Sequence, residues 1–439
     1  MYLIYSILLT LGVVALLPRF VYDALRHGKY VAGIGERLGR VPAVENDKGQ
    51  IVWLHCVSVG EAQAARPLAR EIRRRFPSHK LVVSTTTLTG QRVAREIFRD
   101  DASQVFYFPF DWGCTVRRAL RAVKPDTVLI METELWPGFL RECRKQKIRT
   151  AIVNGRLSEN SFRRYRLIRK FISRVVNDLD LALMQSEEDA ARILALGLAP
   201  ERVHVTGNIK FDAGVDASEN VVTEELRERF DFNGVRPLIV AASTHAPEER
   251  IVIEAFKTLS QRPAESLPKP RLLIAPRHPE RFAETASLLD ASGLKWTRRS
   301  HAAVESDAVC DVVLLDSIGE LRAVYPLACV VFVGGSIART GGHNVLEPAA
   351  AGACIVTGAH TANFKAIMRA FVAADALVQL LPLTESEAVE ALASVFTKLL
   401  ADESHRRELA ARARQLLEQN RGATERTVDM LTVILNEPK

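Results

Sequence analysis

The sequence predicts two α/β domains, each built on a parallel β-sheet. The chain has 439 residues, which is more than one hydrophobic core usually serves and suggests two domains of roughly 200 residues each. Short, continuous apolar runs rich in β-branched residues alternate with helical segments, a pattern typical of strands that are buried on both faces. The runs fall into two series, and the polar stretch at residues 213–236 that separates them contains no predicted strand.

The order of the elements gives the domain boundaries. The first series places strands at residues 51–57, 81–85, 127–131, 150–153 and 181–185, with a further strand at 203–206. The second series places strands at residues 238–242, 271–275, 312–315, 330–333 and 354–357. A helical segment from about residue 403 to 436 follows. We therefore expect domains at 23–212 and 237–410, a linker at 213–236 that is partly helical, and a final helix at 411–439.

The N-terminal residues 1–22 are almost entirely apolar and predict a membrane anchor. A full span needs about 20 apolar residues, so this segment is at the short end of the range. Basic residues follow it, and because such residues stay on the cytoplasmic side, the body of the protein is expected to face the cytoplasm. They are Arg19, Arg26, Lys29, Arg37 and Arg40. The alternative is a helix that lies in the interface of one leaflet or against the protein.

Composition narrows the classes of function only partly. The net charge of +7 allows nucleic acid, a membrane surface or an anionic substrate as a partner. Nucleic acid is the weakest of these, because the basic runs lack interleaved aromatic residues for stacking on bases. The six cysteines form no C-x-x-C pair, which predicts reduced thiols and no zinc site. No other grouping in the sequence indicates a metal.

Ligands of open parallel sheets bind at the carboxyl ends of the strands, so polar residues just after a strand are the site candidates. Glu61 follows the strand at 51–57 and falls near the start of a helix. There it is either a solvated capping residue or a general base aimed at a substrate hydroxyl. Spacing alone leaves these two interpretations open, and in both of them the helix start keeps the carboxylate ionised.

Three further charged residues follow strands in the first domain. Glu132 and Glu134 come directly after the strand at 127–131, and Lys210 follows the strand at 203–206. Paired carboxylates are typical of glycoside hydrolases, although here both come from one short segment, and one of them may only bond the amides of its own turn. Lys210 is either a cation that neutralises a substrate or an ordinary surface lysine.

The second domain carries groups suited to a nucleotide. Arg277 and His278 follow one strand, and an arginine fork suits a phosphate. Ile318, Gly319 and Glu320 stand where the next helix begins, with free backbone N–H groups. The glycine-rich stretch at 334–342 permits close approach of a ligand and precedes Asn344, a helix-cap candidate, and Glu347, which suits ribose hydroxyls.

The motifs HCVSVGE, METELWP, NGRLS, GNIKFD, PRHPER, IGEL and GGHNVLEPAA closely resemble those of the 3-deoxy-D-manno-octulosonic acid (Kdo) transferases. The resemblance covers almost the whole chain. It implies a GT-B fold, with two Rossmann-like domains facing a cleft and a final helix that crosses back to the first domain. It also implies metal-free transfer of Kdo from CMP-Kdo to the lipid A precursor, lipid IVA, with inversion. The setting would be lipopolysaccharide core biosynthesis at the cytoplasmic face of the inner membrane.

The resemblance also assigns roles to the candidate residues. The first domain would bind the acceptor, and in it Glu61 matches the family's proton acceptor, whereas Glu132 and Lys210 match residues that stabilise the transition state. The second domain would bind CMP-Kdo. The segments that match its CMP contacts are Arg277 and His278, then Ile318, Gly319 and Glu320, and finally Asn344, Val345, Leu346 and Glu347. The motifs predict neither the number of Kdo residues transferred nor the acyl pattern of the acceptor.

Three other functions stay open beside this one. They are a GT-B transferase that uses a different sugar nucleotide, a carboxylate-pair glycoside hydrolase, and a non-enzymatic membrane scaffold. Binding of CMP but not UDP would separate the first from the Kdo transferases, and a hydrolase would ignore CMP. The intact glycine-rich stretch and Glu61 argue against the scaffold.

Overall fold

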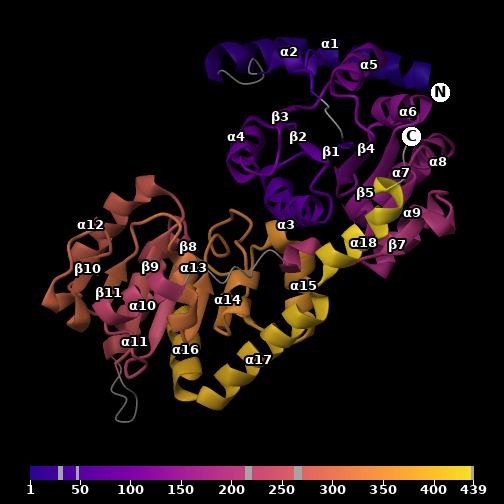
Figure 1. Cartoon of the computed structure of the whole chain (residues 1–439). Coiled ribbons are helices and arrows are strands. Elements are labelled where there is room, and N and C mark those ends of the chain that lie inside the picture. Colours follow the sequence, from indigo (N-terminus) through magenta and orange to yellow (C-terminus); the bar gives the residue numbers. More distant parts are fainter. Residues whose placement is uncertain (28–32, 46–48, 213–219, 262–268, 437–439) are drawn as a thin grey trace. The chain divides into compact units, whose positions relative to one another are not determined.

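The structure is a computed structural model that describes residues 1–27, 33–45, 49–212, 220–261 and 269–436. The chain forms two compact units (Figure 1). Unit 1 comprises residues Met1–Ala213 together with Asn420–Lys439, and unit 2 comprises Gly214–Gln419. Each unit holds one seven-stranded sheet, which confirms the prediction of two parallel α/β sheets.

The sheet of unit 1 has the order β3-β2-β1-β4-β5-β6-β7, and all of its strand pairs are parallel. Its strands are β1 (Ile51–Cys56), β2 (Lys80–Thr85), β3 (Gln104–Tyr107), β4 (Thr127–Met131), β5 (Arg149–Gly155), β6 (Leu181–Met184) and β7 (Val203–Val205). The helices are α1 (Tyr2–His27), α2 (Ile34–Arg37), α3 (Val59–Arg75), α4 (Leu88–Ile97), α5 (Gly113–Val123), α6 (Pro137–Lys145), α7 (Glu159–Leu167), α8 (Arg169–Val176), α9 (Glu187–Ala195) and α18 (Ala423–Leu435).

Alternate side chains of the same strands enter two separate cores, because a strand points successive residues to opposite faces of its sheet. Trp53 belongs to one core, together with Phe106 and Phe139. Leu54 belongs to the other, together with residues of α3 and α18. Since β1 is buried along its whole length, the loop that follows it is held at a fixed place at the sheet's carboxyl edge.

The sheet of unit 2 has the order β10-β11-β9-β8-β12-β13-β14, again with parallel pairs. Its strands are β8 (Leu238–Thr244), β9 (Arg271–Pro276), β10 (Trp296–Arg298), β11 (Val312–Leu314), β12 (Val330–Val333), β13 (Cys354–Thr357) and β14 (Val378–Gln379). The helices are α10 (Asn220–Arg229), α11 (Glu248–Gln261), α12 (Phe282–Ser292), α13 (Leu321–Val324), α14 (Leu346–Ala350), α15 (Lys365–Ala373), α16 (Glu385–Ala401) and α17 (Glu403–Asn420).

The structure divides the chain differently from the expected boundaries in two places. The expected linker at 213–236 contains α10, which belongs to unit 2, while residues 213–219 lie outside the described residues. The expected single C-terminal helix is broken at Gly422, where φ is +79°. The chain therefore ends as two helices, with α17 in unit 2 and α18 in unit 1, and residues 437–439 lie outside the described residues.

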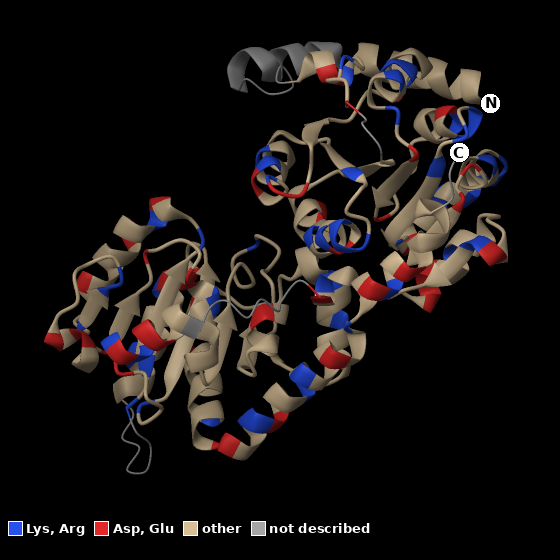
Figure 2. Ribbon diagram, viewed as in Figure 1, with Lys and Arg blue, Asp and Glu red and all other residues tan. Residues whose placement is uncertain are grey.

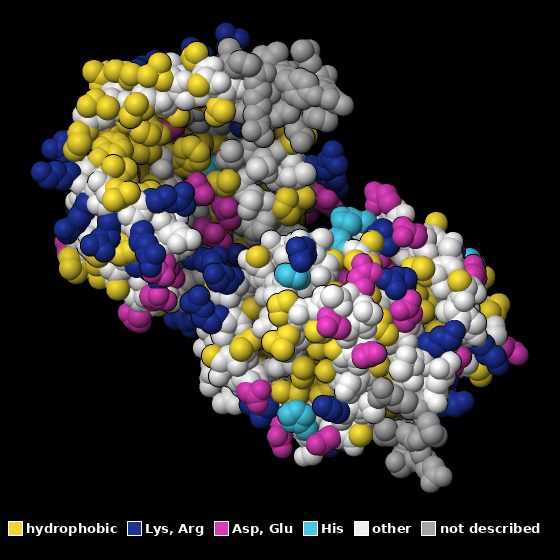
Figure 3. All heavy atoms as spheres, turned by 180° about the vertical axis from the view of Figure 1, so that it is seen from behind, with side chains coloured by type: hydrophobic (Ala, Val, Ile, Leu, Met, Phe, Trp, Pro, Cys, Tyr) yellow, Lys and Arg dark blue, Asp and Glu magenta, His cyan; other side chains and the backbone are white. Residues whose placement is uncertain are grey.

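The predicted membrane anchor forms α1, which is fixed to unit 1 along one side. The Tyr2 hydroxyl donates to Asp178 at 2.7 Å, the Tyr5 hydroxyl donates to Asp111 at 2.7 Å, and Trp112 Nε1 donates to Thr10 at 3.1 Å. Large apolar side chains on α1 are exposed, namely Leu3, Ile4, Ile7, Leu8, Leu11, Val14 and Leu16. Figure 3 shows hydrophobic side chains as a yellow band at the upper left.

Over the described residues, no helix is both long and apolar enough to cross a bilayer, so the membrane anchor stays a prediction. Of the basic residues expected to flank it, Arg37 is buried and its guanidinium donates to the Thr86 carbonyl at 2.6 Å, whereas Arg40 is exposed. The side chains of Arg19, Arg26 and Lys29 lie outside the described residues.

Candidate active site

Glu61 lies in the first turn of α3, directly after β1, and its carboxylate caps that turn. Ser58 is the N-cap residue, and its hydroxyl accepts the Glu61 N–H at 3.4 Å and donates to Glu61 Oε1 at 3.1 Å. The Val57 N–H donates to Glu61 Oε2 at 2.8 Å. The Ser58-x-x-Glu61 spacing is that of a capping box, except that the Glu61 carboxylate accepts the backbone N–H of Val57, one residue before the N-cap.

Glu61 is buried, with 7% of its surface exposed, so it is not the solvated cap that one interpretation expected. Burial raises the pKa of this carboxyl group to about 7, and the negative charges of Glu132 and Glu134 raise it further, against the lowering effect of the Val57 and Ser58 hydrogen bonds. The expectation that the helix start keeps Glu61 fully ionised is therefore wrong. Desolvation outweighs the capping bonds, and the group is balanced between its two protonation states near neutral pH.

Glu132 and Lys210 form an ion pair in unit 1. Lys210 Nζ lies 2.9 Å from Glu132 Oε1, and both side chains are 23% exposed. Glu132 stands at the end of β4 with φ at +54°, a backbone conformation that non-glycine residues rarely adopt. Such strain is often found at functional sites. Lys210 is therefore not a free surface lysine. Burial and the nearby charge of Glu132 raise the pKa of Glu134.

Asn154 holds the Lys210 segment in place, and the sequence analysis did not single it out. Its side-chain oxygen accepts the Ile209 N–H at 3.1 Å, one residue before Lys210. Asn154 is fully buried at the end of β5 and also has a positive φ, of +54°. It belongs to the NGRLS motif, and that motif was the available signal.

The candidate nucleotide segments of unit 2 follow three different strands. Arg277 and His278 come directly after β9 and are exposed. The Arg277 N–H donates to the Thr244 carbonyl at 3.0 Å, which fixes the backbone at this point. The Arg277 guanidinium makes no hydrogen bond or ion pair to any residue that the structure describes, so it is available to an anion.

Ile318, Gly319 and Glu320 lie between β11 and the short helix α13. Ile318 is 82% exposed and Gly319 has φ at +92°, a conformation that favours glycine. The Glu320 carboxylate accepts from Arg299 at 2.8 and 3.1 Å and from the Ser317 hydroxyl. Burial works against ionisation, but these bonds hold the pKa of Glu320 below its ordinary value. The Glu320 side chain is therefore occupied by Arg299 and Ser317. The groups of this segment that are available to a ligand are its backbone N–H groups.

The segment Asn344, Val345, Leu346 and Glu347 opens α14. Asn344 Oδ1 accepts the Leu346 N–H at 3.0 Å in a turn directly before α14, whose N-cap residue is Val345 and not Asn344. Glu347 Oε1 accepts both Arg322 Nε at 3.1 Å and Arg322 Nη2 at 2.9 Å. Val345 and Leu346 are buried, so a ligand of this segment would meet their backbone groups and not their side chains.

Sequence analysis missed Glu248, which organises the glycine-rich stretch. Its fully buried carboxylate accepts five backbone N–H groups at 2.7–3.1 Å: those of His245, Gly335, Ser336, Ile337 and Ala338. The nearby Gly334 passes so close to β8 that an added Cβ would lie 2.6 Å from the Ser243 carbonyl. No sequence signal for this contact existed, because the loop and the carboxylate are about ninety residues apart in the chain.

Comparison with known proteins settles the family. A family model described as "3-Deoxy-D-manno-octulosonic-acid transferase (kdotransferase)" matches residues 32–213. A 3-deoxy-D-manno-octulosonic acid transferase of Haemophilus influenzae is 32% identical over 408 residues, which cover 93% of this chain and 92% of that one. One of Bordetella pertussis is 36% identical over 387 residues, covering 87% and 86%. This chain belongs to the Kdo transferase family.

The fold of this Kdo transferase has counterparts among solved structures. A UDP-N-acetylglucosamine 2-epimerase from Neisseria meningitidis superposes with a TM-score of 0.55 at 14% identity, covering 88% of this chain and 100% of that one. At this identity the likeness concerns the fold alone. It supports the description of the two units as Rossmann-like domains of a GT-B-like fold.

Two basic runs lie in unit 1, one on α3 at residues 66–75 and one around α7 and α8 at residues 163–170, and Figure 2 colours Lys and Arg blue along the ribbon. On α3, Arg74 binds Glu71 at 2.6 and 2.8 Å, Arg75 binds Glu71 and Asp429, and Arg73 lies 3.5 Å from Asp101. In the second run Arg163 is paired with Glu159, whereas Arg169 and Lys170 are exposed.

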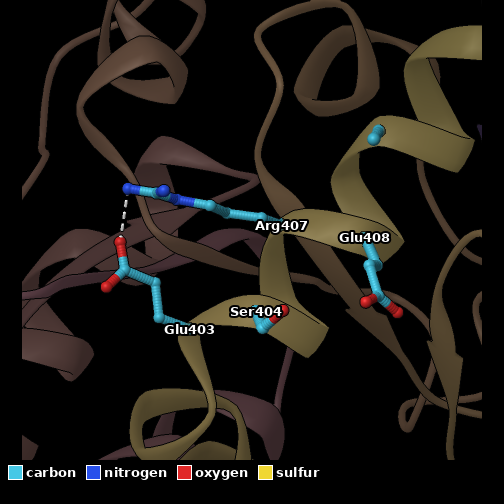
Figure 4. A pocket seen from close by; sticks show the side chains of 5 residues that line it. Glu403, Ser404, Arg407 and Glu408 are labelled. Carbon is cyan, nitrogen blue, oxygen red and sulfur yellow. Dashed lines mark ion pairs between the residues drawn. The ribbon is translucent and has the colours of Figure 1, made fainter.

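A surface pocket of about 500 Å³ lies elsewhere in the Kdo transferase, on α17. Glu403, Ser404, Arg407, Glu408 and Ala411 line it, and the only ion pair drawn in Figure 4 joins Arg407 to Glu403 along the same helix. None of the candidate site residues contributes to it. Within the described ranges, no three His, Cys, Asp or Glu side chains are grouped as ligands for a metal ion.

Proposed function

We propose that the protein transfers Kdo from CMP-Kdo to the lipid A precursor lipid IVA, with inversion at the anomeric carbon and with Glu61 as the general base. The observation that carries the proposal is the buried Glu61 carboxylate, with a pKa raised to about 7, beside the Glu132–Lys210 pair in a member of the Kdo transferase family. A catalytic base works best when its pKa lies near the operating pH.

The chemistry needs one proton acceptor and a stabilised leaving group. As the acceptor's hydroxyl oxygen bonds to the anomeric carbon of Kdo, its proton passes to Glu61. The bond between that carbon and the phosphate oxygen breaks on the opposite face, and its electron pair stays with CMP. Because the attack and the departure occur on opposite faces, the configuration inverts.

Three features of the site support this sequence. The capping bonds from Val57 and Ser58 hold the Glu61 carboxylate in one orientation, which a base requires. The Lys210 ammonium supplies positive charge where the reaction redistributes charge, and Glu132 holds it in position. In unit 2, the free Arg277 guanidinium suits the phosphate of the leaving CMP.

The direct test incubates the purified protein with CMP-Kdo and lipid IVA and determines the mass of the lipid products. We expect a gain equal to one or more Kdo residues, and the mass also counts them. UDP-sugars in place of CMP-Kdo are the control, and a product formed only with a UDP-sugar would contradict the proposal.

We further propose that α1 attaches the enzyme to the cytoplasmic face of the inner membrane. The exposed apolar side chains of α1 lie opposite the side that bonds to Asp111 and Asp178. A helix with one apolar face suits the interface of a bilayer, and the exposed Arg169 and Lys170 in the same unit favour anionic lipid.

A further inference from the structure

Three histidines gather at the carboxyl edge of the unit 2 sheet, each from a different strand-end loop. His245 follows β8, His278 follows β9 and His343 ends the glycine-rich stretch after β12. His245 Nε2 lies 2.8 Å from His343 Nε2, and the ring of His278 stands nearly perpendicular to that of His245, with 5.2 Å between the centroids.

The His245–His343 contact is a direct N–H···N hydrogen bond. The two ring planes are within 3° of each other and the centroids are 5.0 Å apart, while the nitrogens are only 2.8 Å apart. The rings therefore meet through their nitrogen atoms rather than face to face. One Nε2 must carry a proton and the other must offer its lone pair, so only one proton lies between the two rings.

The surroundings keep this pair neutral in the absence of a ligand. Burial lowers the pKa of His343 to about 4 and also lowers the pKa of His245, and the positive charge of Arg277 lowers both pKa values further. Arg281 also lowers the pKa of His245, and Glu249 alone raises it. Glu249 is itself bonded to Arg281 at 3.0 and 3.1 Å, and Glu248 is committed to five amides.

Glu249 is the carboxylate that favours protonation of His245, and its charge is shared with the bonded Arg281. The Arg277 guanidinium has no partner among the described residues, and no carboxylate there bonds to either ring of the pair. An oxyanion is the ligand that fits this group of side chains, because its oxygens can accept hydrogen bonds from Arg277 and from both imidazoles.

The pair is rigidly placed between two segments that are expected to contact CMP. His343 immediately precedes Asn344, and His245 lies beside His278. The backbone N–H of His245 donates to the Glu248 carboxylate at 3.0 Å, and the backbone N–H of Gly335 donates to the same carboxylate at 2.7 Å. A Cβ at Gly335 would lie 2.9 Å from the His343 ring, so the glycine lets the loop and the ring pack closely.

We propose that the His245–His343 pair is a further part of the donor site that binds the phosphate of the nucleoside monophosphate and takes up one proton as it does so. The bare Nε2 receives the proton from solvent, the N–H···N bond opens, and both Nε2–H groups donate to phosphate oxygens. An adjacent anion favours protonated imidazole, which supplies the driving force. The inference rests on the proposed use of a CMP-linked donor.

The test is calorimetric titration of CMP into the full-length protein in two buffers that differ in ionisation enthalpy, at about pH 8. At that pH free CMP is almost fully dianionic, because its second phosphate pKa is near 6. We expect net uptake of about one proton, and loss of this uptake together with about tenfold weaker binding in His245→Asn and in His343→Asn. His301→Asn, which removes an exposed histidine of the same unit, is the matched control and should behave as wild type.

A second measurement needs no variant. The imidazole nitrogen shifts of the ¹⁵N-labelled wild type should show a neutral pair before CMP is added and, afterwards, a proton on both Nε2 atoms, with one ring an imidazolium and the other neutral. CMP binding without proton uptake, or uptake that persists in both variants, would overturn the inference and leave the donor assignment intact. Failure of the wild type to bind CMP would contradict the proposed donor and this inference together. Proton uptake on addition of free Kdo, but not on addition of CMP, would show that the histidine pair does not bind the phosphate.

Discussion

In the proposed mechanism, Glu61 combines two roles that the sequence left as alternatives. It caps α3 through Ser58 and Val57, and the same bonds fix the orientation of its carboxylate. Capping alone would keep the group ionised, whereas burial and the charges of Glu132 and Glu134 raise its pKa to about 7. A capping residue with this pKa is a base that can take a proton and return it to solvent near neutral pH.

The first prediction concerns pH. Because transfer needs ionised Glu61, the logarithm of kcat/KM should fall with unit slope as the pH drops below about 7. Glu134→Gln removes one of the negative charges that raise this pKa, so the pH at which the rate begins to fall should be lower in this variant. The measurement is the initial rate of Kdo transfer between about pH 5 and pH 9. A flat profile below pH 7 would show that no group with this pKa serves as the base.

The second prediction concerns the ion pair. Lys210→Met leaves Glu132 without its cation and should lower kcat by about 100-fold with little change in KM for CMP-Kdo, because unit 2 holds the CMP candidates. The matched control is Lys145→Met, which removes a lysine bonded to Glu142 at 2.7 Å in the same unit. Equal losses of rate in the two variants would argue for a structural effect.

The sequence predicted the positions of these residues better than their environments. The place of Glu61 near the start of a helix was sufficient to predict a cap. The burial of Glu61 depends on elements that are distant in sequence, and the charge of Glu132 reaches it from about seventy residues away. The Glu248 contacts and the His245–His343 bond could not be predicted for the same reason, although His343 belongs to the motif GGHNVLEPAA.

At the scale of elements, α18 is joined to unit 1 by a cap that comes from another part of the chain. Asp212 accepts the Gly422 N–H at 2.8 Å and the Thr424 N–H at 2.6 Å, and it therefore caps the first turn of α18. Residues such as Val428 and Leu431 then enter the core with α3. The cap fixes the break at Gly422, which a continuous helical pattern did not reveal.

The third prediction follows from this cap. Asp212→Ala should destabilise α18 by about 1–2 kcal/mol, since two buried or half-buried N–H groups lose their acceptor. Hydrogen exchange of the α18 amides measures the effect locally. Asp429→Ala on the same helix, which removes only a surface pair with Arg75, should cost less than about 1 kcal/mol. An α18 that exchanges as in wild type in Asp212→Ala would show that the core contacts alone hold it.

The fourth prediction concerns α1. Leu8→Glu combined with Leu11→Glu places charge on its exposed apolar face and should release the protein from vesicles that contain anionic lipid, because burial of apolar surface drives interfacial binding. Val433→Glu, an exposed apolar residue of α18, is the control and should not change binding in flotation assays. Retention of the double variant on vesicles would place the attachment elsewhere.

The central strands were predictable, and so was the edge strand β7, whereas the edge strands β3, β10 and β14 were not. β1, β4, β8 and β12 are buried on both faces, so their sequences are continuous apolar runs. β10 and β14 lie at the edges of their sheet, and their few residues are half-buried or exposed and partly polar. Only tertiary pairing defines such strands.

At the scale of the molecule, the candidate groups divide between the two units. Glu61, Glu132 and Lys210 belong to unit 1, whereas every candidate CMP segment belongs to unit 2. The proposed mechanism therefore assigns the chemistry of the acceptor and the binding of the donor to different compact units of the chain. Substitutions in unit 1 should then change transfer without changing affinity for CMP.

The fifth prediction concerns metal ions. The proposed mechanism draws its positive charge from Lys210 and Arg277, so treatment with a chelator such as EDTA should leave the rate of Kdo transfer unchanged. The rate is measured before and after chelation and after addition of Mg²⁺. Inhibition by the chelator that Mg²⁺ reverses would contradict the metal-free mechanism.

The assignment of Glu61 as the base is tested most directly by Glu61→Gln, studied by single-turnover transfer and by CMP titration on the same preparation. Glutamine keeps the shape of the cap, but its side chain cannot take the proton from the hydroxyl group of the acceptor lipid. The account predicts a loss of transfer of about 100- to 10,000-fold, with CMP affinity equal to that of the wild type. Transfer within a few-fold of the wild-type rate would contradict the central role of Glu61.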